Sequence, residues 1–589
     1  MMDTAVSQAP TSPALDYARR AEQQEVRYAT LKRSLRQAFD PWGLCAIHTR
    51  AALSWASNPL RLATELMGYA NDFAALQRQL IDRLQGMPDE DVFPPHPDDT
   101  RFADPIWREA LFWDAIKETY LMQTHWVQDL LYRSPGLSDA ERRKSAFWLR
   151  QTLNALAPTN FLPTNPVAQQ KAWATQGASL VTGLQHLARD LRAGEVTMSD
   201  PTPFKVGGNL AVTPGAVVYR NHLMEVIHYQ ATTPTVHAMP IVLITPWINK
   251  YYVLDLAPGK SLVEFLVAQG FNVFVTSWKN PDAEMADIGF DDYVEHGAAQ
   301  IVEVAQQMSG SKQVHALGYC IGGTLLTVYL AWANRRDAAH CPVAHWTLLA
   351  TLTDFHAPGD IEVFIDQDGL AVIDGIMRKQ GFLDGKEMAA SFRMLRPNSL
   401  IWNYVVGNYL MGETPRAMDV LYWNADTTRM PREMHRFYLR EFYLHNRLIH
   451  ADSLNIAGRP IDLGRIEQEG FMVAAEEDHI APWMQSFSLT QHVKGPVTFT
   501  LTTSGHILGI VNPPVAASKR SYWQGAVAHH LAPTHWHAAQ QKQPGSWWPS
   551  WVDWLRPRCG PMIKAPPLAT AAYPALANAP GLYVLTETT

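Results

Sequence analysis

The architecture follows from the segment Val314-His315-Ala316-Leu317-Gly318-Tyr319-Cys320-Ile321-Gly322-Gly323. The apolar run 314–317 predicts a buried strand, and residues 324–334 predict the helix that follows it. A tight, strained turn is expected between them, because side chains in place of the glycines would collide with the strand and the helix. Cys320 therefore stands at a helix N-terminus, where the helix end favours a thiolate.

A cysteine in this strand–turn–helix context indicates a nucleophile. The segment follows the elbow pattern G-x-S-x-G of the α/β-hydrolase fold, with Cys320 in place of serine. The backbone N–H of Ile321 is then expected to face the oxyanion that develops during acyl transfer. The alternative is a buried structural cysteine in a glycine-rich turn, the usual role of a lone thiol.

Short apolar runs alternate with helical patterns on both sides of the elbow. This alternation predicts βαβ units and a mainly parallel sheet with helices on both faces. The expected helices are 261–269, 291–308 and 324–334. The expected strands are 212–219, 223–229, 241–245, 273–276, 314–317, 346–352, 471–475 and 497–501.

The other segments differ in character and divide the chain into domains. Residues 1–24 are expected to be disordered, and 25–203 to form an α-helical N-terminal domain, because apolar residues recur there at three- and four-residue spacing. Residues 204–589 form the predicted α/β-hydrolase catalytic domain. Within it, residues 358–445 lack the strand rhythm and predict a helical cap insertion over the carboxyl ends of the strands. The Pro- and Ala-rich residues 556–580 are expected to be a loop.

The partners of Cys320 follow from chain order. In this fold the nucleophile precedes an acid after a late strand and a histidine after the last strand. Asp478 follows the strand 471–475, and His506 follows the strand 497–501. We expect His506 to take the thiol proton and Asp478 to orient its imidazole. Glu477 is the alternative acid, and His479 the alternative base.

The second oxyanion donor is expected in the loop after the strand 241–245. A backbone N–H of Trp247 or of Ile248 is the candidate, and the sequence favours neither. The alternative is an aromatic packing loop. Lys250 could meet a phosphate, and Asp255 and Asp354 lie near sheet ends, but such residues are more often structural hydrogen-bond partners.

Composition excludes several classes of protein. The chain has 589 residues, a net charge of −7 and a pI near 6.3, which argue against a nucleic-acid groove. Four scattered cysteines without a CxxC pair exclude a disulfide framework and a zinc site, so we expect no metal. The N-terminus lacks a signal peptide, and apolar runs reach only about half the length of a membrane span. These features predict a cytoplasmic protein.

Longer strings carry a resemblance to a known family. They are Pro158-Thr159-Asn160-Phe161, Thr164-Asn165-Pro166, Pro214 to Tyr219, Ile248 to Leu256, Ser277 to Asp282, Leu395-Arg396-Pro397-Asn398, Trp402-Asn403-Tyr404, Tyr422-Trp423-Asn424, Glu477-Asp478-His479-Ile480, Ser504-Gly505-His506, Asn512-Pro513-Pro514 and Gly545 to Pro549. With the elbow, they span most of residues 145–555 and resemble the class I poly(3-hydroxyalkanoate) synthases. Thr245 and Trp247 depart from residues common in that family, so substrate fit or rate is expected to differ.

The resemblance implies a template-free polymerase of 3-hydroxyacyl-CoA. Cys320 would carry the acyl group and release CoA, His506 would activate thiol and hydroxyl groups, and Asp478 would orient or assist His506. The substrate-binding candidates are Lys250, Tyr251, Asp255, His479 and Trp423. The CoA thioester is the substrate, so no cofactor is expected. A homodimer at the surface of polyester granules is implied as well.

Two other functions fit the fold. A thioesterase or polyester depolymerase would let water attack the acyl-enzyme, although hydrolases mostly use serine at the elbow. A granule-coating protein would keep the fold without catalysis, although an intact triad argues against it. A thioester suits a thiolate nucleophile, because the leaving thiol matches it in reactivity and the acyl-enzyme keeps its energy for the next transfer.

Overall fold

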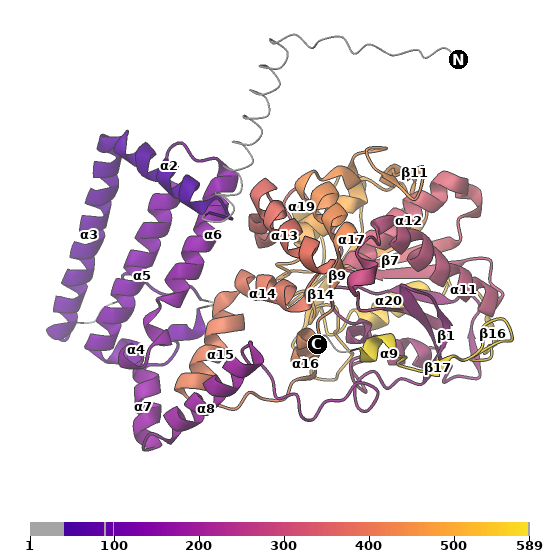
Figure 1. Cartoon of the computed structure of the whole chain (residues 1–589), viewed down its shortest axis with the longest axis horizontal. Helices are drawn as coiled ribbons and strands as arrows, with labels where there is room; N and C mark the ends of the chain where they lie inside the picture. Colours follow the sequence, from indigo (N-terminus) through magenta and orange to yellow (C-terminus); the bar gives the residue numbers. More distant parts are fainter. Residues whose placement is uncertain (1–39, 88–89, 98, 587–589) are drawn as a thin grey trace, which may run out of the picture.

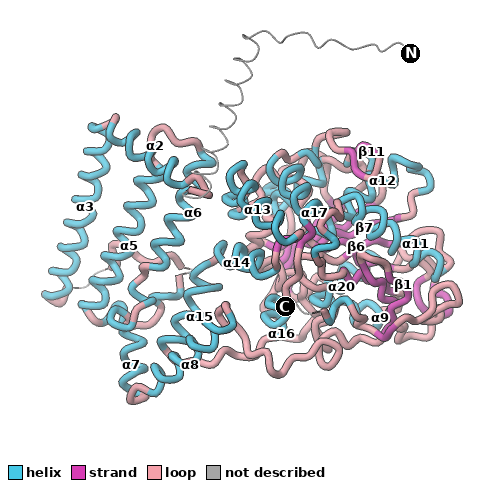
Figure 2. The backbone as a smooth tube through the Cα atoms, in the orientation of Figure 1, coloured by secondary structure: helices cyan, strands magenta, loops and turns pink. Residues whose placement is uncertain are grey.

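The computed structural model describes residues 40–87, 90–97 and 99–586, so the predicted disorder of residues 1–24 lies outside the described residues. A group of long helices stands at one end of the elongated molecule, and a sheet surrounded by helices forms the other (Figure 1). Helices between them join the two parts (Figure 2). Among the described residues, no helix has the length and apolar character that crossing a bilayer requires.

The N-terminal part is helical, as its three- and four-residue apolar spacing predicts. Helix α6 begins with a capping box, in which Ser138 and Glu141 bond to each other's backbone N–H groups. Helix α8 ends at Gly194, which takes the left-handed conformation common after helices. The helices are α2 (Leu44–Ala56), α3 (Pro59–Leu84), α4 (Ile106–Glu109), α5 (Leu111–Tyr132), α6 (Asp139–Ala155), α7 (Pro166–Ala174) and α8 (Ala178–Ala193).

One large sheet organises the catalytic part. Its order is β15-β14-β13-β12-β7-β6-β4-β5-β2-β1-β17. The six strands from β13 to β5 are parallel to their neighbours, and the outer pairs are antiparallel. The strands are β1 (Gly215–Arg220), β2 (Met224–Tyr229), β4 (Ile241–Ile244), β5 (Val273–Trp278), β6 (Val314–Tyr319), β7 (Val343–Leu349), β12 (Glu469–Ala475), β13 (Val497–Thr502), β14 (Ser521–Ala526), β15 (Gln543–Pro544) and β17 (Ala577–Asn578).

Both faces of the sheet are covered. Alternate residues of β4 belong to different cores: Val242 and Ile244 pack on one side, and Ile241 and Leu243 on the other. This is why the central strands are apolar throughout. The covering helices are α9 (Leu262–Ala268), α10 (Phe290–Asp292), α11 (Ala299–Ser309), α12 (Ile321–Asp337), α18 (Trp483–Ser488), α19 (Pro533–Ala538) and α20 (Trp548–Leu555).

The predicted cap is an insertion between β7 and β12. It is mainly helical, with a short strand pair, β8 (Phe382–Leu383) and β9 (Met430–Pro431). A second pair, β10 (Asn455–Ile456) and β11 (Arg459–Pro460), lies between the cap and β12. Its helices are α13 (Gln367–Gln380), α14 (Gly385–Leu395), α15 (Asn403–Val405), α16 (Asp419–Ala425) and α17 (Arg432–Phe437), with the short helical segments η8 (Asp360–Phe364), η9 (Asn398–Trp402) and η11 (Tyr438–Leu444).

Two expectations about the C-terminal part were wrong. The strand 497–501 is not the last, because β14 pairs antiparallel beyond it. Residues 556–580 are not simply a loop: β16 (Met562–Lys564) pairs with β3 (Thr235–His237), and β17 forms an edge of the main sheet. The strands β3, β16 and β17 are two or three residues long, too short for apolar alternation to mark them. The six residues of β14 are mostly half-buried and include Ser, Gln and Gly, so they form no apolar run.

Candidate active site

The elbow has the strained geometry that its sequence predicts. Cys320 adopts φ 52° and ψ −123° at the junction of β6 and α12. A Cβ atom on Gly318 would lie 2.5 Å from the Gly323 Cα, and one on Gly322 would lie 2.3 Å from the Ile244 carbonyl oxygen. Both contacts are with backbone, so only glycine fits these positions. The turn can therefore present Cys320 at the carboxyl edge of the sheet.

Two loops from other strands bring the predicted partners to Cys320. The His506 Nδ1 lies 2.6 Å from the Asp478 Oδ2, and both side chains are buried. Cys320 lies close enough to His506 to raise the pKa of the imidazole. The loops after β6, β12 and β13 meet because these parallel strands end at the same edge. The three residues thus have the arrangement expected of a nucleophile, a base and an acid, and their catalytic roles stay predictions.

The surroundings favour the charged form of His506. Burial lowers its pKa, but the nearby Asp478 and Cys320 outweigh this effect and raise the pKa well above its ordinary value. Asp478 is fixed by the N–H groups of Ile480 and Ala481, which donate to its Oδ1 at 2.8 Å. The carboxylate thus keeps one oxygen for the backbone and one for His506. This arrangement suits an imidazole that receives a thiol proton.

Three tyrosines surround the triad, and no sequence pattern singled them out. The Tyr319 hydroxyl donates to the His506 carbonyl oxygen at 3.2 Å, and its ring stacks on the imidazole. Tyr438 and Tyr443 belong to η11 of the cap, and their ring centroids lie 5.3 Å apart. Both interact electrostatically with Cys320. Burial first, then Tyr443 and Cys320, raise the pKa of Tyr438 well above its ordinary value, so its hydroxyl stays protonated. The one sequence feature that could have indicated them is the high content of Phe, Tyr and Trp in residues 358–445.

The predicted oxyanion loop lies against the elbow. Gly322 approaches the carbonyl oxygens of Ile244 and Thr245, so the loop after β4 lies beside the first turn of α12. The N–H of Ile321 is in that first turn, where helices leave donors without an intrahelical acceptor. The Trp247 ring packs within about 5.5 Å of the Trp278 and Tyr293 centroids, in the core. The roles of Ile321, Trp247 and Ile248 as donors stay predictions.

The substrate-binding candidates Lys250 and Trp423 join the same loop to the cap. The Lys250 ammonium pairs with Asp426 at 2.6 Å, and the Trp423 indole donates to the Lys250 carbonyl oxygen at 2.7 Å. Lys250 is only 6% exposed. In this structure its charge is therefore engaged by a carboxylate, and the two residues link α16 to the loop after β4.

Two further candidates are buried beneath that loop. Asp255 accepts hydrogen bonds from Thr213 at 2.5 Å and Ser261 at 2.7 Å. The Tyr251 hydroxyl lies 3.5 Å from that of Tyr229, and burial raises the pKa of Tyr251 well above its ordinary value. Hydrogen bonds within the fold therefore satisfy Asp255. A substrate-binding role for either residue stays a prediction.

Asp354 lies on the loop after β7. It accepts hydrogen bonds from Asn446 and Ser488, each at 2.8 Å. It therefore acts as a structural hydrogen-bond partner, the more common of the two roles considered for it.

The chain is similar to proteins of one enzyme family along most of its length. The model "Poly-beta-hydroxybutyrate polymerase (PhaC) N-terminus" matches residues 98–266, and "alpha/beta hydrolase fold" matches residues 240–513. The "Poly(3-hydroxyalkanoate) polymerase" of Methylorubrum extorquens is 40% identical over 91% of this chain and 89% of its own. The chain belongs to the poly(3-hydroxyalkanoate) polymerase family. Membership confirms the predicted α/β-hydrolase fold and an enzyme of the acyltransferase type.

Two other relatives carry the name "Poly(3-hydroxyalkanoate) polymerase subunit PhaC". The protein of Rhizobium meliloti is 40% identical over 85% of this chain and 82% of its own. That of Cupriavidus necator is 39% identical over 89% of this chain and 88% of its own. Similarity to this polymerase family thus extends through the N-terminal helices as well as the sheet.

In this family member, the alternative acid and base occupy different surroundings from the triad. Glu477 is exposed. His479 is half-buried beside Arg396 and Asp360 of the cap, and burial first, then Arg396, lower its pKa to about 4. His479 is therefore neutral near pH 7. Both Asp478 oxygens already have other partners, so His506 is the base that the geometry favours.

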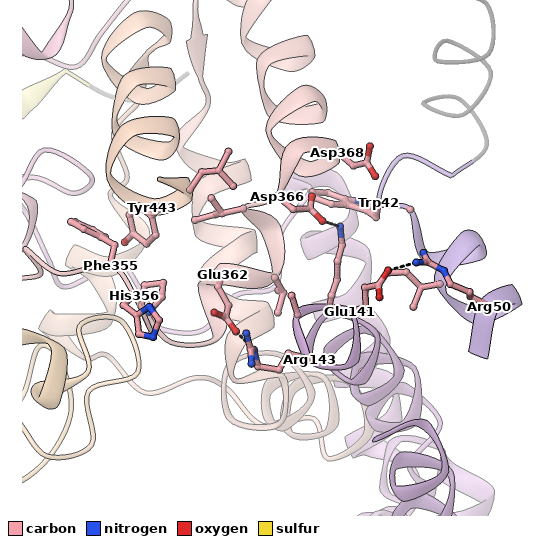
Figure 3. A pocket seen from close by; sticks show the side chains of 18 residues that line it. Trp42, Arg50, Glu141, Arg143, Phe355, His356, Glu362, Asp366, Asp368 and Tyr443 are labelled. Atoms are coloured by element: carbon pink, nitrogen blue, oxygen red, sulfur yellow. Dashed lines mark hydrogen bonds and ion pairs between the residues drawn. The ribbon is translucent and has the colours of Figure 1, made fainter. Parts of the chain in front are cut away.

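A hollow of about 270 Å³ lies beside the cap, between α2, α6 and η8 (Figure 3). Arg143 pairs with Glu362, and Lys144 pairs with Asp366, so ion pairs join the N-terminal helices to the cap around it. Tyr443 lines its far side. The hollow therefore reaches one of the tyrosines that face the triad.

One acidic cluster has the spacing of a metal site, although the sequence predicts no metal. Asp91, Asp114 and Glu118 offer oxygens within 4.8 Å of one another. The Lys117 ammonium lies among them, 3.0 Å from Asp91 and 2.8 Å from Asp114. A side-chain cation thus balances the cluster.

Proposed function

We propose that this family member joins 3-hydroxyacyl units, delivered as CoA thioesters, into a polyester through an acyl-Cys320 intermediate. The observation that carries this proposal is the contact chain Cys320–His506–Asp478 at a strained elbow. The names of the relatives support the product class. The thiol nucleophile supports transfer between thioesters, because its acyl-enzyme retains the reactivity of the substrate.

The first half-reaction loads the enzyme. His506 takes the Cys320 proton, and the sulfur attacks the thioester carbonyl carbon. Negative charge develops on the carbonyl oxygen, toward which the N–H of Ile321 and that of Trp247 or Ile248 would donate. When the tetrahedral intermediate collapses, the carbon–sulfur bond to CoA breaks. His506 returns the proton to the leaving CoA thiolate.

The second half-reaction forms the ester. The 3-hydroxyl of another hydroxyacyl-CoA gives its proton to His506 and attacks the acyl-Cys320 carbonyl. The carbon–sulfur bond breaks, and the Cys320 thiolate recovers the proton. The lengthened chain is now a CoA thioester, and it reloads Cys320 with loss of CoA. Each cycle adds one unit and releases one CoA.

The decisive variant is Cys320→Ala. We expect it to abolish CoA release, because no other group at the elbow can form the acyl-enzyme. The measurement combines a thiol assay with labelled 3-hydroxyacyl-CoA, followed by detection of protein-bound label. Label that stays covalently bound to the variant would show that another residue carries the chain. Buried Cys341, whose pKa burial raises, provides the matched variant Cys341→Ala, which should keep activity.

Product analysis separates polymerisation from hydrolysis. The wild-type enzyme should release CoA while an insoluble polyester accumulates. CoA release with free hydroxyacid and no polymer would instead establish a thioesterase. A slow rate of Cys320 labelling at neutral pH, equal to that of Cys341, would favour a non-catalytic coat protein.

The same proposal includes a homodimer that works at polyester granules in the cytoplasm. Several large apolar side chains on the N-terminal helices are exposed, which supports contact with an apolar phase. They are Leu60, Met67, Trp173, Val181, Leu184 and Leu191. Light scattering of the purified chain tests the dimer, and cosedimentation with polyester particles tests the granule contact. A monomer in solution would refute the proposed dimer. A protein that stays in the supernatant would refute the proposed contact with granules.

A further inference from the structure

A second, larger hollow lies where the N-terminal helices meet the cap. Its volume is about 590 Å³, within the range of small-molecule sites. Strings that carry the family resemblance but have no role in the triad form its two walls. Thr159, Asn160 and Asn165 line it from the N-terminal side, and 395–399 with 402–403 line it from the cap. The hollow therefore exists only when both parts of the chain are in contact.

Arg396 connects this hollow to the catalytic loop. It lines the hollow, and its Nη2 donates to the Glu477 carbonyl oxygen at 3.4 Å. Glu477 immediately precedes the catalytic Asp478. Arg396 also acts electrostatically on His479, on the other side of Asp478. A guanidinium thus stands between the hollow and the loop that orients His506.

A second arginine faces the hollow from the N-terminal side. Arg150 on α6 pairs with Asp360 at 3.2 Å, and both side chains are about half exposed. Such an exposed pair is worth roughly 0–1 kcal/mol, so an incoming anion can compete with Asp360. The third arginine, Arg101, is held by both oxygens of Asp99 at 2.8 Å. Arg150 and Arg396 are therefore the cations available to a ligand, and guanidinium groups bind phosphate through two parallel bonds.

The cap wall adds groups that suit a nucleoside. The Asn398 side-chain oxygen is buried and has no hydrogen-bond partner in the structure, so it calls for a donor. The partly buried Trp402 indole lies one helical turn further along the same wall. An amine or hydroxyl could satisfy Asn398, and an aromatic base could stack on Trp402. A neutral polyester has neither the donors nor the charge that this site would accept.

We propose that this hollow binds the nucleotide half of the CoA thioester, with Arg150 and Arg396 on its phosphates. This inference rests on the proposed function, because it assigns a place to the same substrate. The acyl end would then pass along the loop 477–479 toward Cys320. The N-terminal domain thereby supplies part of the substrate site, which a sheet and cap alone would lack.

The test compares two thioesters of the same 3-hydroxyacyl group. One carries CoA, and the other carries N-acetylcysteamine, which lacks the nucleotide. In Arg150→Ala and Arg396→Ala, kcat/KM for the CoA thioester should fall by about tenfold or more through KM, while kcat/KM for the short thioester should change by less than about threefold. The matched control is Arg143→Ala, because Arg143 lies on the same helix and pairs with Glu362 of the cap outside this hollow. The assignment would be overturned if kcat/KM of Arg150→Ala and Arg396→Ala fell equally with both thioesters or did not fall at all. It would also be overturned if Arg143→Ala showed the same selective loss with the CoA thioester.

Binding of adenosine 3′,5′-bisphosphate provides a readout that needs no turnover. Calorimetry on Cys320→Ala should detect its binding, and adding Arg150→Ala or Arg396→Ala should weaken it by about tenfold or more. Absence of binding, or binding unchanged by these substitutions, would refute the site. Failure of the wild-type enzyme to release CoA would refute the proposed function instead, while this measurement would still decide the hollow.

Discussion

At the scale of single residues, the proposed mechanism depends on how Asp478 divides its two oxygens. One accepts from the Ile480 and Ala481 N–H groups, and the other faces His506 at 2.6 Å. The carboxylate is therefore held in place before it orients the imidazole. With Nδ1 engaged, the other ring nitrogen is the one left for Cys320. The site needs no motion of the acid during proton transfer.

His506→Gln should lower the rate of CoA release by roughly 10²–10⁴-fold, the usual contribution of a general base. His479→Gln should cost much less, because His479 lies beside Arg396 and Asp360 rather than against Cys320. The measurement is the initial rate of thiol release, with thermal unfolding of both variants as the control for folding. A larger loss in His479→Gln would reassign the base.

Glu118 makes stability depend on pH. Burial first, with Asp91 and Asp114, raises its pKa to about 7, while the Phe93 N–H and Lys117 oppose the rise. The folded chain thus binds this proton more tightly than the unfolded chain, so stability should fall as pH rises from about 4.5 to 7. Glu118→Gln should flatten that dependence by up to about 3 kcal/mol. Urea unfolding at pH 5 and pH 8 measures it.

The control for Glu118 is Glu109→Gln, which removes an exposed carboxylate from α4. It should leave the difference between the two pH values unchanged. If Glu118→Gln behaves like this control, the Glu118 carboxyl group is already ionised in the folded chain at pH 5. The Lys117 ammonium would then lower the pKa of Glu118 by more than burial raises it.

At the scale of elements, the contact between α6 and η8 joins the N-terminal helices to the start of the cap. Phe364 of η8 inserts between Trp42, Phe147 and Trp148, with ring centroids 5.4–6.1 Å apart. The ion pair between Arg143 and Glu362 also joins α6 to η8 (Figure 3). Apolar burial at the centre outweighs the exposed charges around it.

Phe364→Ala should lower the free energy of unfolding by about 3–5 kcal/mol, because it empties a buried aromatic site. Arg143→Ala should cost no more than about 1 kcal/mol. Denaturant unfolding measures both, and limited proteolysis should cut the Phe364→Ala cap faster. Similar stability losses in the two variants would mean that the ion pairs, rather than the aromatic centre, hold the cap.

Elements with a clear period were predictable, and those fixed by distant contacts were not. The strand at Val314 and the helices α9 and α12 follow from apolar spacing, so their bounds lie within a few residues of expectation. The two-residue strand at Ala577 has no periodic signal, because its place depends on β1 more than 350 residues earlier. In the site, the elbow pattern selected Cys320 and chain order selected Asp478 and His506, but Tyr443 and Arg396 reach their places only through the fold of the cap.

At the scale of the whole molecule, the C-terminal segment closes one edge of the sheet. β17 pairs with β1, and the next residues cover a buried carboxylate on β2. That residue, Glu225, accepts from the N–H groups of Leu582 and Tyr583 at 3.0 Å and pairs with Arg220. Gly581 permits the approach, because a Cβ there would lie 2.4 Å from the carboxylate. The last segment thus supplies hydrogen-bond donors to a buried carboxylate placed early in the catalytic part.

Deletion of residues 576–589 should therefore destabilise the chain by about 3 kcal/mol or more, since hydrogen bonds to a buried charge are worth roughly 1.5–3 kcal/mol each. The loss should shrink when Glu225→Gln is added to the deleted chain, because a neutral amide costs less to leave with fewer partners. Urea unfolding of the four chains, full-length and deleted with either residue, isolates the coupling. An equal loss with Glu225 and with Gln would show that the segment acts through β17 pairing alone.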